Sequence, residues 1–311
     1  MRSIRSGSAP ALVRWIARPL TGFVVLGSNG EAALMDDFEA DRVIVAAREA
    51  IPRDRPFIVG TGRESTQAAV RAAKRAAEHG ADAVLVRTPA FFKTQMTTDA
   101  FVRHYTVVAD ASPVPVLLLR FTAVTGVNLL PAAVTRLAPH PNIIGMKESN
   151  ADVAQIADLV SGTPADFQVL AGTTSTFYAA LCVSAVGGIL APACVIPDAC
   201  IRLFELARAG RHAEAVQLQR ELMPLARLLG QALRRAGIEG GPESDRLRRR
   251  RAAAAAAARA RRCVRRAARG DRTFRGDSRM SLLPDVDRIL LGPGPSLTRA
   301  ARDARRWRRR R

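Results

Sequence analysis

The chain has 311 residues, 48% of them hydrophobic, and a formal net charge of +20. This composition supplies enough apolar side chains for one sizeable core, and no apolar run approaches the length of a membrane-spanning helix. The four cysteines show no paired metal-binding spacing, and they fit buried or free thiols in a reducing compartment, here the cytoplasm. The four histidines fall in helical or loop patterns, where we expect surface or packing roles. We therefore predict no metal and no membrane partner.

The positive charge is concentrated at the C-terminal end. Residues 246–311 contain 23 arginines, no lysines and 5 aspartates, a net charge of +18, which leaves +2 for residues 1–245. An arginine-rich tail of this kind binds polyanions by counterion release rather than by recognition. We therefore expect no specific nucleic-acid partner, and a polyanion-binding protein is the weakest of three hypotheses for the function.

Short apolar runs alternate with helical patterns between residues 20 and 210. Runs typical of buried strands occupy residues 22–26, 56–59, 83–86, 115–119, 143–146, 168–170 and 187–190. Helical patterns occupy residues 37–50, 64–79, 98–109, 131–138, 152–160, 176–184 and 197–209. This alternation indicates parallel βαβ units in an α/β protein, with the chemistry at the C-terminal ends of the strands.

The first of these strands ends in a small polar turn, Gly27-Ser28-Asn29-Gly30. The two glycines let the backbone approach a ligand closely, and the N–H groups and the Ser28 hydroxyl could hold a carboxylate. A plain strand-to-helix turn is the alternative interpretation.

Lys147 ends the apolar run 143–146, where a lone amine is unusual. An ammonium at the mouth of an apolar core is poorly solvated, which lowers its pKa and supplies the neutral amine that forms a Schiff base with a ketone. The alternative is a lysine that extends from the strand end to solvent.

Together these segments resemble the dihydrodipicolinate synthase and N-acetylneuraminate lyase superfamily. The resemblance runs from about Leu20 to Gly230 and rests on the residue runs 27–31, 60–62, 88–92, 125–126, 145–149, 170–172 and 187–188. Within the superfamily, Ser28-Asn29, Ser149 and the run 166–172 are most similar to the 4-hydroxy-2-oxoglutarate aldolases, which release pyruvate and glyoxylate.

The resemblance implies a (β/α)8 TIM barrel, a small 2-oxoacid substrate, no cofactor and a homotetramer. Lys147 is then the catalytic residue, which attacks the C2 ketone. The implied substrate-binding residues are Ser28 and Asn29 for the C1 carboxylate, Ser149 for the substrate hydroxyl, Thr88 for ordering a proton relay, and Gly187 and Gly188 for backbone contact with the bound acid.

The sequence departs from the family at residues 115–126. Leu119 stands where family members carry a tyrosine that relays protons, and the two tyrosines of this chain, Tyr105 and Tyr178, lie in helical patterns. Val124 replaces the arginine of dihydrodipicolinate synthases, which argues against that activity, whereas Arg120 could take part in carboxylate binding. A dihydrodipicolinate synthase-like enzyme or other sugar-acid lyase and a catalytically inactive barrel remain as alternatives.

Both ends of the chain are atypical for the family. Residues 1–19 supply no strand, so the barrel of residues 20–210 is expected to lack its first strand and to leave two neighbouring strands with unpaired edges. Residues 211–241 form a C-terminal helical remnant, and residues 242–311 an arginine-rich tail that we expect to be disordered and unnecessary for folding. The tail resembles GC-rich DNA translated out of frame. Its residues 282–296 are similar to the start of a pyridoxal-phosphate aminotransferase, without the cofactor lysine.

Overall fold

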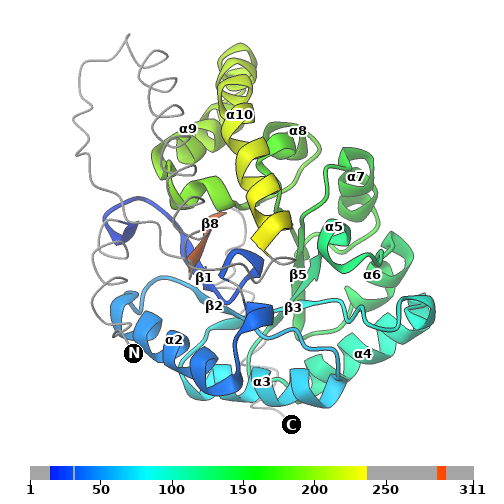
Figure 1. The fold of residues 1–311 in the computed structure, drawn as a ribbon. Helices are drawn as coiled ribbons and strands as arrows, with labels where there is room; N and C mark the ends of the chain where they lie inside the picture. The colour runs from blue at the N-terminus through cyan, green and yellow to red at the C-terminus, as the bar shows by residue number, and fades with distance from the viewer. Residues whose placement is uncertain (1–14, 31, 237–285, 292–311) are drawn as a thin grey trace.

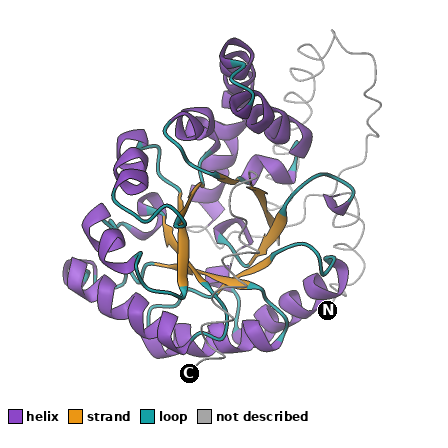
Figure 2. Ribbon diagram, turned by 180° about the vertical axis from the view of Figure 1, so that it is seen from behind, coloured by secondary structure: helices purple, strands orange, loops and turns teal. Residues whose placement is uncertain are grey.

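The computed structural model describes residues 15–30, 32–236 and 286–291. In this part of the chain seven parallel strands and one antiparallel strand close into a barrel that helices surround (Figures 1 and 2). The strands are β1 Gly22–Val25, β2 Phe57–Gly60, β3 Ala83–Arg87, β4 Val116–Arg120, β5 Ile143–Glu148, β6 Gln168–Ala171, β7 Gly187–Ile189 and β8 Val286–Leu291. The prediction of a TIM barrel with seven parallel strands is confirmed.

The helices follow the strands in the predicted alternation. The α-helices are α2 Asp37–Ala50, α3 Thr66–Glu78, α4 Thr98–Ala111, α5 Thr122–Thr125, α6 Pro131–Leu137, α7 Val153–Ser161, α8 Phe177–Cys182, α9 Pro197–Arg208 and α10 His212–Ala236. Short 3-10 turns are η2 Ser28–Gly30, η3 Ala32–Leu34, η4 Lys93–Gln95, η5 Thr174–Thr176 and η6 Ala191–Cys194. Side-chain caps begin several helices; in α2, Asp36 and Glu39 form a reciprocal capping box.

The core has two parts because side chains alternate across each strand. One part fills the barrel interior and consists of Val24, Ile58, Ala83, Leu85, Leu117, Leu119, Ile144, Leu170 and Ile189. The larger part lies between the strands and the surrounding helices. The interior is therefore packed with apolar side chains, which makes any polar group facing it conspicuous.

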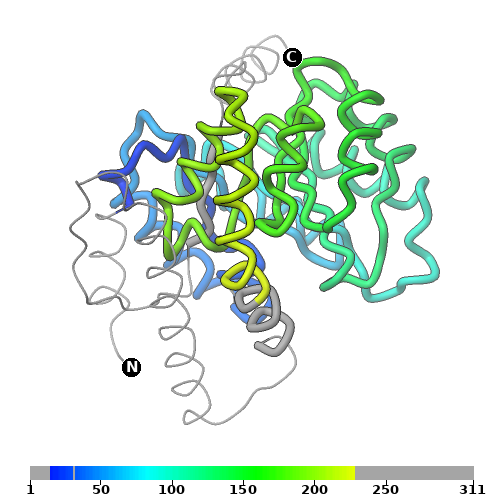
Figure 3. The backbone as a smooth tube through the Cα atoms, turned by 90° about the horizontal axis from the view of Figure 1, so that it is seen from above, coloured from blue at the N-terminus to red at the C-terminus, as the bar shows by residue number. Residues whose placement is uncertain are grey.

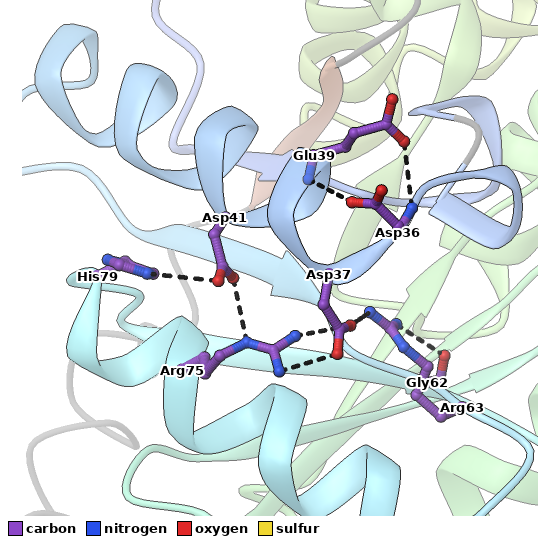
Figure 4. A network of polar contacts seen from close by, with 8 residues as sticks. All are labelled: Asp36, Asp37, Glu39, Asp41, Gly62, Arg63, Arg75 and His79. Atoms are coloured by element: carbon purple, nitrogen blue, oxygen red, sulfur yellow. Dashed lines mark hydrogen bonds and ion pairs between the residues drawn. The ribbon is translucent and has the colours of Figure 1, made fainter.

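Ion pairs outside the barrel join α2 to α3 (Figure 4). Arg75 contacts Asp37 at 2.7 Å and Asp41 at 3.2 Å, and Arg63 contacts Asp37 at 3.2 Å. The hydrogen bond from Arg75 is the main reason that the pKa of Asp37 lies below its usual value. These partly exposed pairs orient two neighbouring helices and contribute little stability individually.

The junction between β1 and β7, the first and last parallel strands, differs from the expectation; we call it the seam. We expected two unpaired edges there, but β8 pairs antiparallel with both strands, and Ile289 is in register with Gly22 of β1 and Ile189 of β7. Figure 1 shows β8 beside β1, although the two are more than 260 positions apart in the sequence. A strand from the arginine-rich region thus closes the barrel, with the opposite polarity to its neighbours.

Helix α10 packs beside α9 (Figure 3), and Leu222 and Leu225 contribute to the outer core. Gln219 ties α10 to the end of the barrel: its amide nitrogen donates to the Thr174 carbonyl at 2.9 Å, and its amide oxygen accepts from the Tyr178 N–H at 3.0 Å. Residues 1–14, at the start of the atypical N-terminus, and 237–285 and 292–311, which make up most of the tail, lie outside the described residues. None of the described helices is both long enough and apolar enough to cross a membrane.

Candidate functional site

Lys147 lies near the C-terminal end of β5 and faces the barrel interior. It is in register with Leu119 of β4 and Leu170 of β6, both of which belong to the interior core. Residues level with one another on parallel strands point to the same face, so the Lys147 side chain enters the same layer. It is only 7% exposed. The structure therefore places the amine at the mouth of an apolar interior rather than extending it along the outside.

Leu119 occupies the position directly beside Lys147. It is 4% exposed, and on its other side it is level with Arg87 of β3. Neither of the two tyrosines of this chain places its phenol beside Lys147. Tyr105 is fully buried in α4, where its hydroxyl donates to the Val86 carbonyl at 3.3 Å and burial raises its pKa, and the Tyr178 hydroxyl lies 2.7 Å from His212 Nδ1.

Ser149, two residues after Lys147, brings a hydroxyl to the same place. It is 6% exposed, and its Oγ has no hydrogen-bond partner among the described residues. A Cβ atom built on Gly172, just after β6, would lie 2.1 Å from Ser149 Oγ and 2.9 Å from Lys147 Cε. The amine stem and the unpaired hydroxyl therefore flank the same point next to Gly172.

Arg120 does not face the barrel interior, and its guanidinium is bonded to protein groups rather than directed toward the place where a substrate carboxylate was expected. Its Nη1 donates to Glu148 Oε2 at 2.6 Å and its Nε donates to Asn128 Oδ1 at 2.6 Å, with Arg120 and Glu148 both buried. Glu148 also accepts the Asn150 N–H at 2.7 Å. Burial raises the pKa of Glu148, and the Arg120 guanidinium only partly offsets this effect. The pair ties the ends of β4 and β5 together on the face opposite Lys147, because side chains alternate along each strand.

Ser28 and Asn29 form the 3-10 turn η2 at the C-terminal end of β1, the same end of the barrel as Lys147. Both are partly exposed, whereas Gly27 and Gly30 are buried and joined by a 3.1 Å hydrogen bond from the Gly30 N–H to the Gly27 carbonyl. The turn thus presents two polar side chains on a compact backbone at the strand end.

Thr88 follows β3 directly, and a second threonine that the sequence analysis missed, Thr61, follows β2. Each is 1% exposed, and neither Oγ1 has a hydrogen-bond partner within the described residues. A buried hydroxyl without a partner is uncommon in proteins and marks a position where a ligand or a water can bind. One indication of Thr61 was present in the sequence: it belongs to the run 60–62, which resembles a family motif but to which no role was assigned.

The two glycines of β7 have different surroundings. Gly187 is level with Leu170 and therefore faces the interior. A Cβ on Gly188 would lie 2.8 Å from Phe177 Cε2, so the packing of α8 against the barrel already accounts for a glycine there.

Among the described residues, no group of three or more histidine, cysteine, aspartate or glutamate side chains is arranged to hold a metal ion.

Comparisons with known proteins identify the family of this chain. The model of the dihydrodipicolinate synthetase family matches residues 10–241. A probable 4-hydroxy-2-oxoglutarate aldolase, mitochondrial, from Emericella nidulans is 37% identical over 205 residues, which cover 64% of this chain and 66% of that relative, just under two thirds of its length. A 4-hydroxy-tetrahydrodipicolinate synthase from Methanoculleus marisnigri is 35% identical over 215 residues, which cover 69% and 73% of the two chains.

A solved structure extends the comparison to the fold. The chloride-inhibited dihydrodipicolinate synthase from Acinetobacter baumannii, complexed with pyruvate, superposes with a TM-score of 0.70 at 26% identity. The superposition covers 80% of this chain and 91% of that one. The family match to residues 10–241 spans the parallel strand ends that carry the candidate site.

Proposed function

Because this chain belongs to the dihydrodipicolinate synthetase family, we propose that it is a Schiff-base-forming carbon–carbon lyase acting on a 2-oxoacid. Its proposed reaction is the cleavage of 4-hydroxy-2-oxoglutarate to pyruvate and glyoxylate. The observation that carries the proposal is the buried Lys147 at the C-terminal mouth of an apolar barrel. The fungal relative named as an aldolase for this substrate supports the choice of reaction.

The proposed chemistry begins at the Lys147 amine. Its neutral form attacks the C2 ketone, and loss of water gives a protonated imine that withdraws electrons from the C3–C4 bond. Removal of the proton from the C4 hydroxyl then releases glyoxylate and leaves an enamine of pyruvate. Protonation at C3 and hydrolysis return pyruvate and the free amine. The protonated imine supplies the electron withdrawal, so the cycle needs no cofactor.

The polar groups at the mouth have complementary proposed roles. Ser28 and Asn29 hold the C1 carboxylate, and the unpaired Ser149 hydroxyl positions the substrate hydroxyl. The buried Thr88 hydroxyl helps to order proton transfer. Gly187 brings the backbone of β7 close to the bound acid, and Gly188 takes part through its backbone only, because its Cα faces Phe177. Leu119 leaves the position beside the amine without a phenol, and general acid–base catalysis typically contributes ~10² to 10⁴ in rate. We therefore propose that cleavage is slower than imine formation.

A second candidate reaction comes from the bacterial and archaeal relatives that are named 4-hydroxy-tetrahydrodipicolinate synthases. Val124 weighs against it, because this apolar side chain is 54% exposed and supplies no cation for a second substrate's carboxylate.

We also keep the homotetramer and the cytoplasmic location as proposals. The name of the fungal relative places that protein in mitochondria instead.

Product release distinguishes these reactions. Purified protein is incubated with 4-hydroxy-2-oxoglutarate, and glyoxylate and pyruvate are measured against a Lys147→Arg variant, which keeps the positive charge but cannot supply a comparable amine. We expect both products to form in equal amounts with the natural chain alone. Absence of both products from folded protein, together with turnover in a 4-hydroxy-tetrahydrodipicolinate synthase assay, would instead support the second candidate.

A further inference from the structure

We propose that Gly172 is a positioning residue that sets where the Lys147 amine and the Ser149 hydroxyl lie. The inference rests on the proposed function of Lys147, and it gives a role to a part of the run 170–172 that the proposed chemistry leaves unused. Gly172 itself touches no reacting atom; it acts by leaving a space.

The space is defined by three close approaches. A Cβ atom on Gly172 would lie 2.1 Å from Ser149 Oγ, 2.9 Å from Lys147 Cε and 3.0 Å from the Glu148 carbonyl oxygen. The first distance is far inside van der Waals contact, so any side chain at position 172 must displace the hydroxyl, the amine stem or both. Either displacement moves a group that the proposed reaction uses.

Two hydrogen bonds join the backbone around Gly172 to the end of β5, so a backbone shift that relieved such a contact would break them. The Gly172 N–H donates to the Glu148 carbonyl at 2.6 Å, and the Thr173 hydroxyl donates to the Ser149 carbonyl at 2.6 Å. Two consecutive residues after β6 are thus bonded to two consecutive carbonyls at the end of β5. Because a shift of the Ser149 and Lys147 side chains breaks neither hydrogen bond, we expect these side chains to move first.

The space also explains why the Ser149 hydroxyl has no partner. It is 6% exposed and lies against Gly172, which has no side chain and whose N–H is already bonded to the Glu148 carbonyl. A hydroxyl left unpaired beside the amine can bond a substrate oxygen, whereas one rotated away by a methyl group at position 172 cannot. Gly172 therefore positions two groups together.

The test compares Gly172→Ala with the natural chain in two reactions. The first is borohydride trapping of pyruvate, followed by mass mapping of Lys147. The second is reductive methylation with formaldehyde and cyanoborohydride, which reports the reactivity of the Lys147 amine without any need to recognise a 2-oxoacid. We expect Gly172→Ala to slow trapping at least tenfold and to shift the pH profile of Lys147 methylation, with an unchanged circular dichroism spectrum.

Two further variants make the result specific. Gly162→Ala adds the same methyl group at the end of α7, where a Cβ would lie 3.0 Å from the Asp158 carbonyl oxygen, and it should leave both reactions as they are. In Gly172→Ala/Ser149→Ala the 2.1 Å contact is gone, so Lys147 reactivity should partly recover relative to Gly172→Ala.

Each outcome decides a separate question. Equal trapping and methylation in Gly172→Ala and the natural chain overturn the positioning role. No pyruvate trapping in the natural chain, together with a methylation profile that still depends on residue 172, overturns the proposed function and keeps the positioning role. A loss in Gly172→Ala that the double variant does not reduce overturns the Ser149 part of the inference, because the 2.9 Å contact with Lys147 Cε would then be the cause of the loss.

Discussion

At the scale of single residues, the site combines a retained amine with a missing phenol. Lys147 and Leu119 are level on neighbouring strands, and both face the barrel interior. A tyrosine at position 119 would therefore start from the backbone position next to the amine. The leucine is well packed, so a larger ring must be accommodated at the open end of the interior.

We predict that Leu119→Tyr raises the rate of 4-hydroxy-2-oxoglutarate cleavage at least tenfold. The reason is that a phenol beside the imine can transfer the protons that leucine cannot, which is commonly worth ~10² or more in rate. Glyoxylate release is measured for both chains. Leu119→Phe is the matched control, because it adds the ring without the hydroxyl and should give no gain. Equal rates for the tyrosine and phenylalanine variants would contradict the relay role of this position.

His104 gives a prediction for the pH dependence of stability. It is 5% exposed, its Nδ1 lies 2.9 Å from the Thr66 hydroxyl, and burial lowers its pKa from 6.5 to about 4. Because the folded-state pKa is lower than the unfolded one, the unfolded chain binds the proton first as the pH falls. The stabilisation is therefore complete above pH 6.5 and is lost as the pH falls from 6.5 toward 4.

The expected loss is about 3 kcal/mol over this range, since each pKa unit corresponds to about 1.4 kcal/mol. The free energy of unfolding is measured by denaturant titration at several pH values for the natural chain and for His104→Gln, which can keep a hydrogen bond to Thr66 but does not titrate. Parallel pH profiles of the two chains would contradict the assignment.

At the scale of elements, the sequence predicted both ends of each of the seven parallel strands to within two residues, because buried parallel strands are continuous apolar runs. It did not predict α5, a single turn that follows β4, where a four-residue helix has no readable period. It could not predict β8 either. Val286–Leu291 has four apolar residues beside Asp287 and Arg288 inside an arginine-rich region, and nothing local specifies that it pairs with strands so distant in sequence.

We predict that a chain ending at Gly241 unfolds at a lower temperature than the full chain. This reverses the expectation that the tail is unnecessary, because β8 supplies hydrogen-bond partners to the edges of β1 and β7. In a domain of this size, each 1 kcal/mol lost lowers the midpoint by about 2–4 °C. Ile289→Pro removes one backbone donor within β8 and should act in the same direction. Ala260→Pro, outside β8, is the control.

Melting curves by circular dichroism report the result. Coincident midpoints for the full chain, the shortened chain and Ile289→Pro would show that the seam does not need β8.

At the scale of the whole molecule, some features could be predicted from the sequence and others are visible only in the structure. The order and spacing of the strand-end motifs were enough to predict the barrel, the family and the place of Lys147. The side-chain directions were not predictable, because a strand end alone does not show which face a residue takes. For this reason the sequence did not predict that Arg120 bonds to Glu148 on the outer face of the barrel. The surroundings of Thr61 and Gly172 likewise depend on neighbouring strand ends that are distant in the sequence.

The net charge of the molecule is distributed unevenly along the chain. Most of the +20 net charge belongs to residues that lie outside the described part of the chain, while residues 1–245, which include the parallel strands and the candidate site, carry +2. A role in binding polyanions would thus belong to the tail and would weaken steeply with salt. It would leave the chemistry at Lys147 unchanged.

The measurement that tests the account most directly is borohydride trapping with pyruvate, followed by peptide mapping of the whole chain. The account predicts that one lysine, Lys147, gains the mass of the reduced pyruvate adduct, and that Lys147→Arg gains none under the same conditions. An adduct on a different lysine, or no adduct on folded protein at saturating pyruvate, would contradict the assignment of Lys147 as the Schiff-base residue.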